Sequence, residues 1–433
     1  MKILILSYSY SPKQDPRSFR WTALSAHWAA YGHNVTVVTT ELPHAQGDVS
    51  GDQLVHVIRI PEMFIGRLRG QTKKSAPISY RGPDEKSSRV SPISRQLCAK
   101  AMRVVYNRTL RSIQWPDFAW TWIMPAKNCV RKLIAENSYD VLISVSLPFS
   151  GHVVGAMAKR KIPKLKWIMD VGDPFCFLEK TPVNNSLIYR KFNTSIERRY
   201  FQQADAISVT TSATRHEYVK RFPESSGKII IIPPLLSIPL TNQADKESND
   251  TFKRPKRLLY VGRLYKDIRT PNFLIECFYK AKDLIRDDIE LHFVGGYDGL
   301  EAFVDKIKDR TVVFHGQRSH EVAAGMMINA DWLVNIGNET SYQLPSKLAE
   351  YVSSGKPILN ICSFAEDSSA EFLRDYPSAV SLYVKDNVTE EHIKALANFI
   401  EAVKPLGEAE RIRWERKFSI EAISRSYEQL FHG

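Results

Sequence analysis

Two stretches in the second half of the sequence carry residue types that bind phosphate groups. The first begins at Tyr260 and reads YVGRLYKDIRTPN, with Arg263, Lys266 and Arg269 placed just after an apolar run. Gly262 permits a tight exit from the expected strand, and arginine offers paired donors to a phosphate. These residues fit a pyrophosphate site at the carboxyl end of a strand, and they also fit a solvated basic turn.

The second stretch begins at Gln343 and reads QLPSKLAEYVSSGKPILN. We expect Pro345 to open a helix and Gly355 to close it. The first amides of that helix, together with Lys347, would attract an anion. Glu350 lies three residues further along the same helical face, where one carboxylate could accept two hydrogen bonds from a ribose diol. An exposed helical ion pair is the alternative for Lys347 and Glu350.

The first half offers five further candidates, which follow expected strands or begin expected helices. Asp15 and Arg17 lie in the first loop, where they could contact a phosphate or a sugar or could only cap the next helix. Asp170 and Asp173 follow a strand, where a carboxylate could orient a reacting hydroxyl or cap a turn. His152 lies in the first turn of a helix, where it could line a ligand site or have a structural role.

The order of the expected elements predicts the fold class. Short, continuously apolar runs such as Lys2–Ser7 and Trp332–Ile336 alternate with helical stretches, which is typical of parallel strands buried on both faces. We therefore expect two doubly wound α/β domains. The polar stretch TNQADKESNDTFKRP after Pro233-Pro234 marks the boundary. The predicted organisation is a first domain at 1–233, a linker at 234–255, a second domain at 256–412, and a C-terminal helix at 413–433 that crosses back to the first domain.

Several of these motifs together resemble one enzyme family. The pieces GR at 262–263, PSKLAEY at 345–351 and SSGKP at 353–357 are similar to the donor domain of retaining glycosyltransferases of family four. DVLISVSLPFSGH at 140–152, DVGDPF at 170–175 and ERRYFQQADAI at 197–207 resemble the acceptor domain of the same family. The resemblance covers nearly the whole chain except 62–115, and it implies the two-domain GT-B fold.

The resemblance also implies roles for individual residues. Arg263 and Arg269 would hold a diphosphate, with Lys347 as a third phosphate contact and Glu350 as the ribose-binding acid. The remaining donor-binding candidates are Lys266, Tyr342, Leu344, Pro345 and Ser346. Asp170 and Asp173, together with Arg263 and Lys347, are the catalytic candidates, and Asp15, Arg17 and His152 would form an acceptor or phosphate loop.

The sequence departs from the family pattern at two places. Family members often carry a second acid eight positions before the ribose-binding one, but here that position is Tyr342, and Glu339 is displaced by three residues. The usual consecutive glycines of the first loop are replaced by Gln14-Asp15-Pro16-Arg17. The identity of the donor sugar therefore stays open.

The positive charge is concentrated in the first half. Residues 1–200 hold 30 Lys and Arg against 14 Asp and Glu, whereas residues 201–433 hold 30 against 33. Part of the excess lies in the basic insertion at about 62–115. That insertion could be a solvated loop and helix, a surface for anionic lipid headgroups, or a nucleic-acid site, for which no recognisable module is present.

We therefore expect a glycosyltransferase that moves a sugar, with retention, from a nucleoside-diphosphate sugar to a hydroxyl of a glycan or lipid-linked acceptor, in polysaccharide or glycoconjugate assembly. In retaining members the leaving phosphate is thought to accept the hydroxyl proton.

Absence of a D-x-D motif and of a His/Cys cluster predicts no metal and no cofactor. Five widely spaced cysteines, no apolar run of about 20 residues, and no leader peptide predict a cytoplasmic protein. The basic first half could hold it at the inner face of the cytoplasmic membrane. A nucleotide-sugar epimerase of the same fold and an inactive sugar-nucleotide-binding protein are the alternatives.

Overall fold

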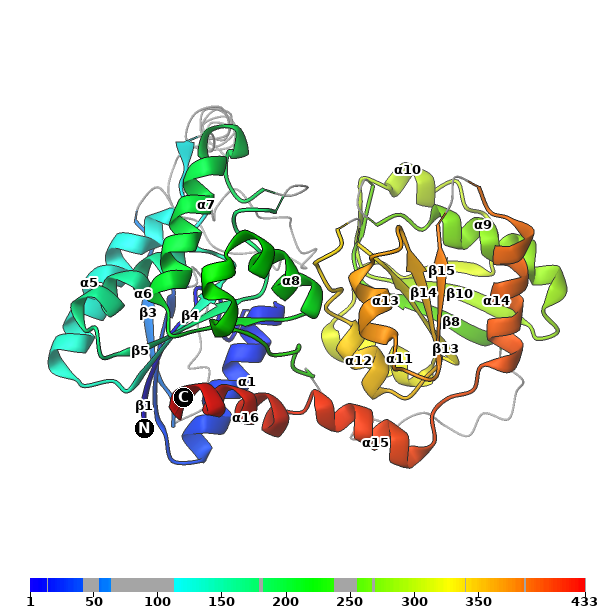
Figure 1. The fold of residues 1–433 in the computed structure, drawn as a ribbon. Coiled ribbons are helices and arrows are strands. Elements are labelled where there is room, and N and C mark those ends of the chain that lie inside the picture. The colour runs from blue at the N-terminus through cyan, green and yellow to red at the C-terminus, as the bar shows by residue number, and fades with distance from the viewer. Residues whose placement is uncertain are drawn as a thin grey trace, which may run out of the picture. The chain divides into compact units, whose positions relative to one another are not determined.

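The computed structural model describes residues 1–13, 15–41, 54–63, 113–178, 182–236, 255–266, 269–338, 340–384 and 387–432 (Figure 1). The chain divides into two compact units. Unit 1 contains Met1–Val209, Tyr218–Ile230 and Glu428–Gly433, and unit 2 contains Thr210–Glu217 and Ile231–Tyr427. Most of the basic insertion and of the linker lies outside the described residues, so the roles expected for them stay predictions.

Unit 1 is built on a seven-stranded sheet in the order β3-β2-β1-β4-β5-β6-β7. Its strands are β1 (Lys2–Leu6), β2 (Asn34–Thr40), β3 (His56–Ile60), β4 (Val141–Ser146), β5 (Lys166–Val171), β6 (Ala206–Val209) and β7 (Ile229–Ile231). The pairs from β3 through β6 are parallel. All six residues of β4 are buried, as expected for a central strand that has helices on both faces.

Helices cover the two faces of this sheet (Figure 1). They are α1 (Pro16–Ala30), α5 (Trp120–Glu136), α6 (Ser150–Lys161) and α7 (Ser186–Gln203). The chain continues through α8 (Ser212–Arg221), which begins in unit 2 and ends in unit 1, and a 3₁₀ turn at Pro223–Lys228. On α1 the buried ring of Trp28 meets Phe431 edge-on, with 5.3 Å between ring centroids. Phe431 comes from α16 (Ile420–His432), whose last turn is counted with unit 1.

Unit 2 has a second parallel sheet in the order β12-β10-β8-β13-β14-β15. Its strands are β8 (Lys256–Val261), β10 (Ile289–Val294), β12 (Val312–Phe314), β13 (Trp332–Ile336), β14 (Ile358–Cys362) and β15 (Ala379–Tyr383). A separate two-stranded ribbon joins β9 (Leu264–Tyr265) to β11 (Tyr297–Asp298).

Two apolar cores lie on opposite faces of the second sheet. One packs α9 (Asn272–Ala281) and α14 (Glu390–Ala402) against it, and the other packs α11 (His320–Asn329) and α12 (Leu348–Ser353). The shorter helices of this unit are a 3₁₀ turn at Lys282–Leu284, α10 (Glu301–Val304), α13 (Ser368–Leu373) and α15 (Glu408–Lys417). Two sheets with helices on both faces confirm the expected doubly wound fold class.

The helix expected to begin at Pro345 begins later than predicted. Residues 345–347 form a turn in which the amide of Leu348 donates to the Pro345 carbonyl at 3.2 Å, and α12 starts only at Leu348. The predicted start is thus three residues too early, because residues 345–347 form a turn and not the first turn of the helix, and helix ends are the least certain part of such a prediction. The first helical residue of α9 is Asn272, with Pro271 in the N-cap position.

Candidate functional site

The carboxyl edge of the unit 1 sheet contains a buried carboxylate, Asp170, near the end of β5. Its Oδ2 accepts from Arg17 Nη1 at 3.3 Å and from the indole N–H of Trp21 at 3.2 Å, while Oδ1 accepts from Ser208 Oγ at 2.8 Å. Asp170 is only 2% exposed. Asp170 therefore anchors the Arg17 guanidinium at this edge, while Asp173, two residues after β5, is half-buried.

Arg17 depends on the absence of a side chain at Gly172. A Cβ built on Gly172 would lie 0.7 Å from Arg17 Nη2, so the guanidinium occupies the space that any larger residue would take. Arg17 belongs to the first turn of α1, which follows the first loop. The sequence thus brings Arg17 and Asp170 together, although they are 153 positions apart.

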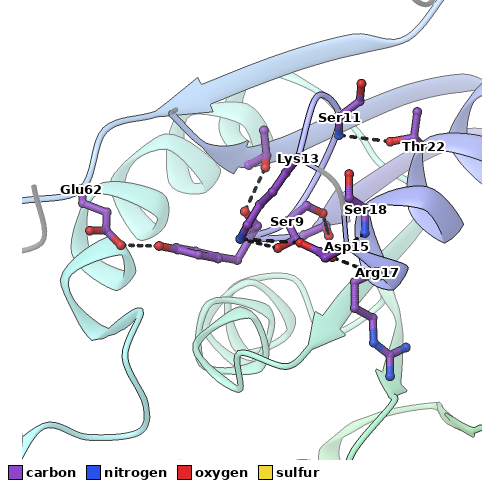
Figure 2. A network of polar contacts seen from close by, with 11 residues as sticks. Ser9, Ser11, Lys13, Asp15, Arg17, Ser18, Thr22 and Glu62 are labelled. Atoms are coloured by element: carbon purple, nitrogen blue, oxygen red, sulfur yellow. Dashed lines mark hydrogen bonds and ion pairs between the residues drawn. The ribbon is translucent and has the colours of Figure 1, made fainter. Parts of the chain in front are cut away.

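Asp15 caps α1. Its Oδ1 accepts from the backbone amides of Arg17 at 3.1 Å and Ser18 at 2.9 Å, and its other oxygen lies 3.7 Å from Lys13 Nζ. Figure 2 shows Lys13 reaching toward Ser9 and Asp15 inside the loop, while the side chain of Arg17 points away from that network. The cap alternative for Asp15 has direct geometric support.

His152 lies inside unit 1 with no exposed surface. Its Nδ1 is 2.7 Å from Ser144 Oγ, which also accepts from the indole N–H of Trp167 at 2.8 Å. Burial lowers the pKa of His152 to about 3, with the Asp170 charge raising it and the Arg17 charge lowering it. In this arrangement His152 supports the packing of α6 on β4.

The three cations of the basic turn of unit 2 differ in exposure and in their partners. Arg263 is exposed and its Nη1 lies 3.2 Å from Asp298 Oδ2 across the β9–β11 ribbon. Lys266 is exposed beyond that ribbon. Arg269 is half-buried, and its guanidinium donates to Asn338 Oδ1 and, at 3.4 Å, to the hydroxyl of Tyr260.

Glycine allows the loops at the ends of β8 and β10 to touch. Gly295 has φ of 138°, and a Cβ there would lie 2.0 Å from the carbonyl oxygen of Gly262. A Cβ on Gly296 would lie 3.4 Å from Arg263 Nε. The Tyr260 hydroxyl donates to the Arg263 carbonyl at 3.2 Å, so this close approach of the two loops, together with Tyr260, fixes the backbone that carries Arg263.

Lys347 and Glu350 form a cluster with a third residue, His320. Lys347 Nζ lies 2.7 Å from Glu350 Oε2 and 2.9 Å from His320 Nε2, and that nitrogen lies 3.4 Å from Glu350 Oε1. Glu350 is 4% exposed. Burial alone would raise the pKa of Glu350, but the contact with His320 and the charge of Lys347 outweigh burial and lower it. The carboxylate is therefore ionised at neutral pH.

One oxygen of Glu350 keeps unused hydrogen-bonding capacity. Despite its short distance to Lys347, Oε2 receives no aligned hydrogen bond within the described part of the chain. The Lys347 ammonium compensates the charge of Oε2, and this oxygen can accept a further hydrogen bond from a ligand or water.

Tyr351 connects the two stretches that sequence analysis selected. Its hydroxyl accepts from the amide of Val261 at 2.8 Å and lies 3.3 Å from the carbonyl of the same residue. Val261 is the last residue of β8, two positions before Arg263, and Tyr351 directly follows Glu350. This phenol therefore fixes the start of the basic turn relative to α12.

The other donor-binding candidates lie in the loop between β13 and α12. Tyr342 and Leu344 are half-buried, Pro345 is buried and Ser346 is exposed. The carbonyl of Gln343 accepts from Asn338 Nδ2 at 2.9 Å, and Asn338 also receives the Arg269 guanidinium. Asn338 thus holds this loop beside the basic turn, whereas Glu339 lies outside the described residues.

Sequence reasoning missed His320, Asn338 and the linking role of Tyr351. The sequence contains one signal for His320, because it follows Ser319, a residue type favoured as an N-cap. In the structure the Ser319 hydroxyl oxygen accepts from the amide of Val322 at the start of α11. A histidine at the start of that helix follows the carboxyl end of β12, where ligands of such sheets bind.

Two protein-family models match most of the chain. A glycosyl transferase 4-like domain matches residues 19–234, and the family of glycosyl transferases group 1 matches residues 255–402. The chain therefore belongs to the group 1 glycosyltransferases of the GT-B fold. This confirms the family and the fold expected from the motifs, while retention of configuration stays a prediction.

Individual relatives agree with this assignment. An uncharacterized glycosyltransferase, MJ1069 of Methanocaldococcus jannaschii, is 25% identical over 305 residues, covering 68% of this chain and 75% of its own length. The crystal structure of WaaG, a glycosyltransferase involved in lipopolysaccharide biosynthesis, aligns over all of both chains with a TM-score of 0.57 and 16% identity. Anabaena HepE in complex with UDP-glucose has a TM-score of 0.54 and 13% identity, with 99% and 98% of the chains covered. The two structures show the shared fold.

Proposed function

We propose that the enzyme transfers a hexose, with retention, from a nucleoside-diphosphate sugar to a hydroxyl of a glycan or lipid-linked acceptor. The observation that carries the proposal is Glu350, a buried ionised carboxylate with unused capacity on Oε2. It lies beside Lys347 and is connected through Tyr351 to the turn that holds Arg263. A ribose diol next to a diphosphate has the hydroxyl donors and the negative charge that these residues need.

In the proposed reaction the bond between the anomeric carbon and the diphosphate breaks, and a bond to the acceptor oxygen forms. The acceptor proton passes to the leaving diphosphate. Arg263, Arg269 and Lys347 would stabilise the charge that develops on the leaving group, which is where electrostatic catalysis contributes most. We propose that no metal is required, because three side-chain cations supply this stabilisation.

The nature of the donor has indirect support. HepE, which shares the fold, is crystallised with UDP-glucose, so a uridine nucleotide is our first choice of probe. The proposed role is in cell-surface polysaccharide or glycoconjugate assembly, on the cytoplasmic side of a membrane. Within the described residues, none of the helices has the length and apolar character needed to cross a membrane.

The experiment compares UDP with 2′-deoxy-UDP by isothermal titration, with GDP as a base control. If Glu350 holds the diol, wild type should bind UDP about tenfold or more tightly than 2′-deoxy-UDP, as expected for a charged hydrogen bond worth about 1.5–3 kcal/mol. Glu350→Gln should lose most of this discrimination. Glu276→Gln is the matched control, because Glu276 forms an exposed helical ion pair with Lys280 at 2.7 Å.

Equal discrimination by wild type and Glu350→Gln would contradict the donor-site assignment. Slow release of UDP from UDP-glucose would separate a transferase from an inactive binding protein, and conversion to another UDP-hexose would indicate the epimerase instead.

A further inference from the structure

Unit 1 contains a cavity that the donor site does not explain. It has a volume of about 590 Å³ and lies between α7, the end of α8 and the loop after β5. We call it the arginine cavity, and it is lined by Cys176, Phe177, Leu178, Ser186, Arg190, Thr194, Arg198 and Arg221. All of these residues belong to unit 1, whereas Lys347 and Glu350 belong to unit 2.

Three guanidinium groups give the arginine cavity a positive character. Arg198 Nε lies 3.4 Å from Glu224 Oε1, and the Arg221 guanidinium stacks over the Phe177 ring at 4.2 Å from its centroid. Within the described residues no ion pair includes Arg190, whose guanidinium is exposed. Among the described residues, the lining of the cavity holds three guanidinium groups and no carboxylate, which gives this part of the surface a positive character.

A buried carboxylate holds one wall of the arginine cavity in place. Glu197 accepts from the Tyr218 hydroxyl at 2.7 Å and from the Cys176 amide at 2.9 Å. Burial raises the pKa of Glu197, although its hydrogen bonds act in the opposite direction. Since Glu197 is 1% exposed and already accepts these bonds, it fixes the loop at Cys176 and does not compete for the arginines.

The shape and donors of the arginine cavity match a phosphate ester. Ser186 and Thr194 also line the cavity, with the Thr194 hydroxyl donating to the Arg190 carbonyl at 3.0 Å. Ser186 begins the 18-residue helix α7, whose N-terminus favours an anion. Arginine binds phosphate oxygens through paired donors. The volume lies within the range of small-molecule sites and exceeds what a bare phosphate needs.

The arginine cavity is close in sequence to the acceptor candidates. Cys176 lies three residues after Asp173, so the chain between them spans at most about 11 Å. Leu187 directly follows the lining residue Ser186 on α7 and is 96% exposed. An exposed apolar side chain next in sequence to the cavity suits a ligand that combines a phosphate with an apolar part.

We propose that the arginine cavity is a second anion subsite, which binds a phosphate ester carried by the acceptor. Binding of an anion in the arginine cavity does not depend on the donor site. The further claim that this anion belongs to the acceptor rests on the proposed glycosyl transfer. The phosphate could belong to a lipid headgroup or to a soluble phosphorylated glycan, and the experiment below separates the two sources.

The test uses glycerol 3-phosphate as a soluble probe and vesicles of phosphatidylglycerol in phosphatidylcholine as a lipid probe. Arg190→Gln should weaken glycerol 3-phosphate binding about tenfold or more. Arg199→Gln is the matched control, because Arg199 is exposed on the same helix and does not line the cavity. UDP is titrated in parallel and should bind all three proteins equally.

Loss of both soluble and vesicle binding in Arg190→Gln would support a lipid-borne phosphate, and loss of soluble binding alone would support a soluble one. Equal glycerol 3-phosphate affinity in Arg190→Gln and Arg199→Gln, or none in wild type, would overturn the subsite. Failure of UDP to bind any of the proteins would contradict the proposed function and leave the subsite result standing.

Discussion

Protonation of His152 should couple the stability of unit 1 to pH, and this coupling tests whether the residue is structural. The imidazole is fully buried, and its pKa is lowered to about 3 in the folded chain, against about 6.5 in an unfolded chain. Between these two values the unfolded state binds a proton at this position and the folded state does not. Stability is therefore lost as pH falls below about 6.5 and continues to fall toward 3.

The magnitude follows from the difference between the two states. At pH 5 the pH is about 1.5 units below the pKa of the unfolded histidine, which is therefore protonated only in the unfolded state. This lowers the free energy of unfolding by on the order of 2 kcal/mol relative to neutral pH. His152→Asn removes the titration while keeping a polar atom near Ser144 Oγ. The smaller side chain should also lower stability at every pH, but that offset does not change the slope.

The assay is native-state hydrogen exchange of the α6 amides, corrected for intrinsic rates, between pH 7 and pH 5. Wild type should lose about 2 kcal/mol more opening free energy than His152→Asn over this range. His56→Asn replaces an exposed histidine of unit 1 and should keep the wild-type slope. Parallel curves for wild type and His152→Asn would refute the reasoning and return His152 to the candidates for ligand contact.

Two further predictions concern the edges of the sheets. Gly295→Ala should destabilise unit 2 by about 2–5 kcal/mol in thermal denaturation, because its Cβ would collide with the Gly262 carbonyl at a φ of 138°. Gly316→Ala, with φ of 66° and no atom within 4 Å of the added Cβ, should cost only about 1–2 kcal/mol, and equal losses would contradict the steric argument. Asp170→Asn should lower unit 1 stability by about 1–3 kcal/mol in urea, because Arg17 loses its charged partner. Unchanged stability would show that Asp170 does not anchor Arg17.

Continuous apolar runs predicted most of the fold. Trp332–Ile336 has the expected bounds, and Lys2–Ser7 differs from β1 by one residue, because a run buried on both faces leaves few alternatives to a central parallel strand. The three-residue strand β7 was not predicted, since Ile229–Ile231 is too short to show a period and two of its residues are exposed.

The candidate site was predictable only where spacing along one element determines a contact. Lys347 and Glu350 are three residues apart, and their side chains meet as that spacing suggests. His320 joins them from another helix, at a separation of 27 positions from Lys347. No local pattern encodes that contact, because it depends on the lateral order of β12, β13 and β14 in the sheet.

Both units use a buried carboxylate to hold a cation at a sheet edge. Asp170 is 2% exposed and anchors Arg17, and Glu350 is 4% exposed and lies beside Lys347. A carboxylate removed from water is costly unless a cation and hydrogen bonds compensate it, so each pair restricts where its cation can lie. The carboxylate also neutralises much of the positive charge that an anionic ligand would meet at each cation. Because Arg190 in the arginine cavity forms no ion pair among the described residues, we expect a phosphate there to meet a less compensated charge than at Lys347.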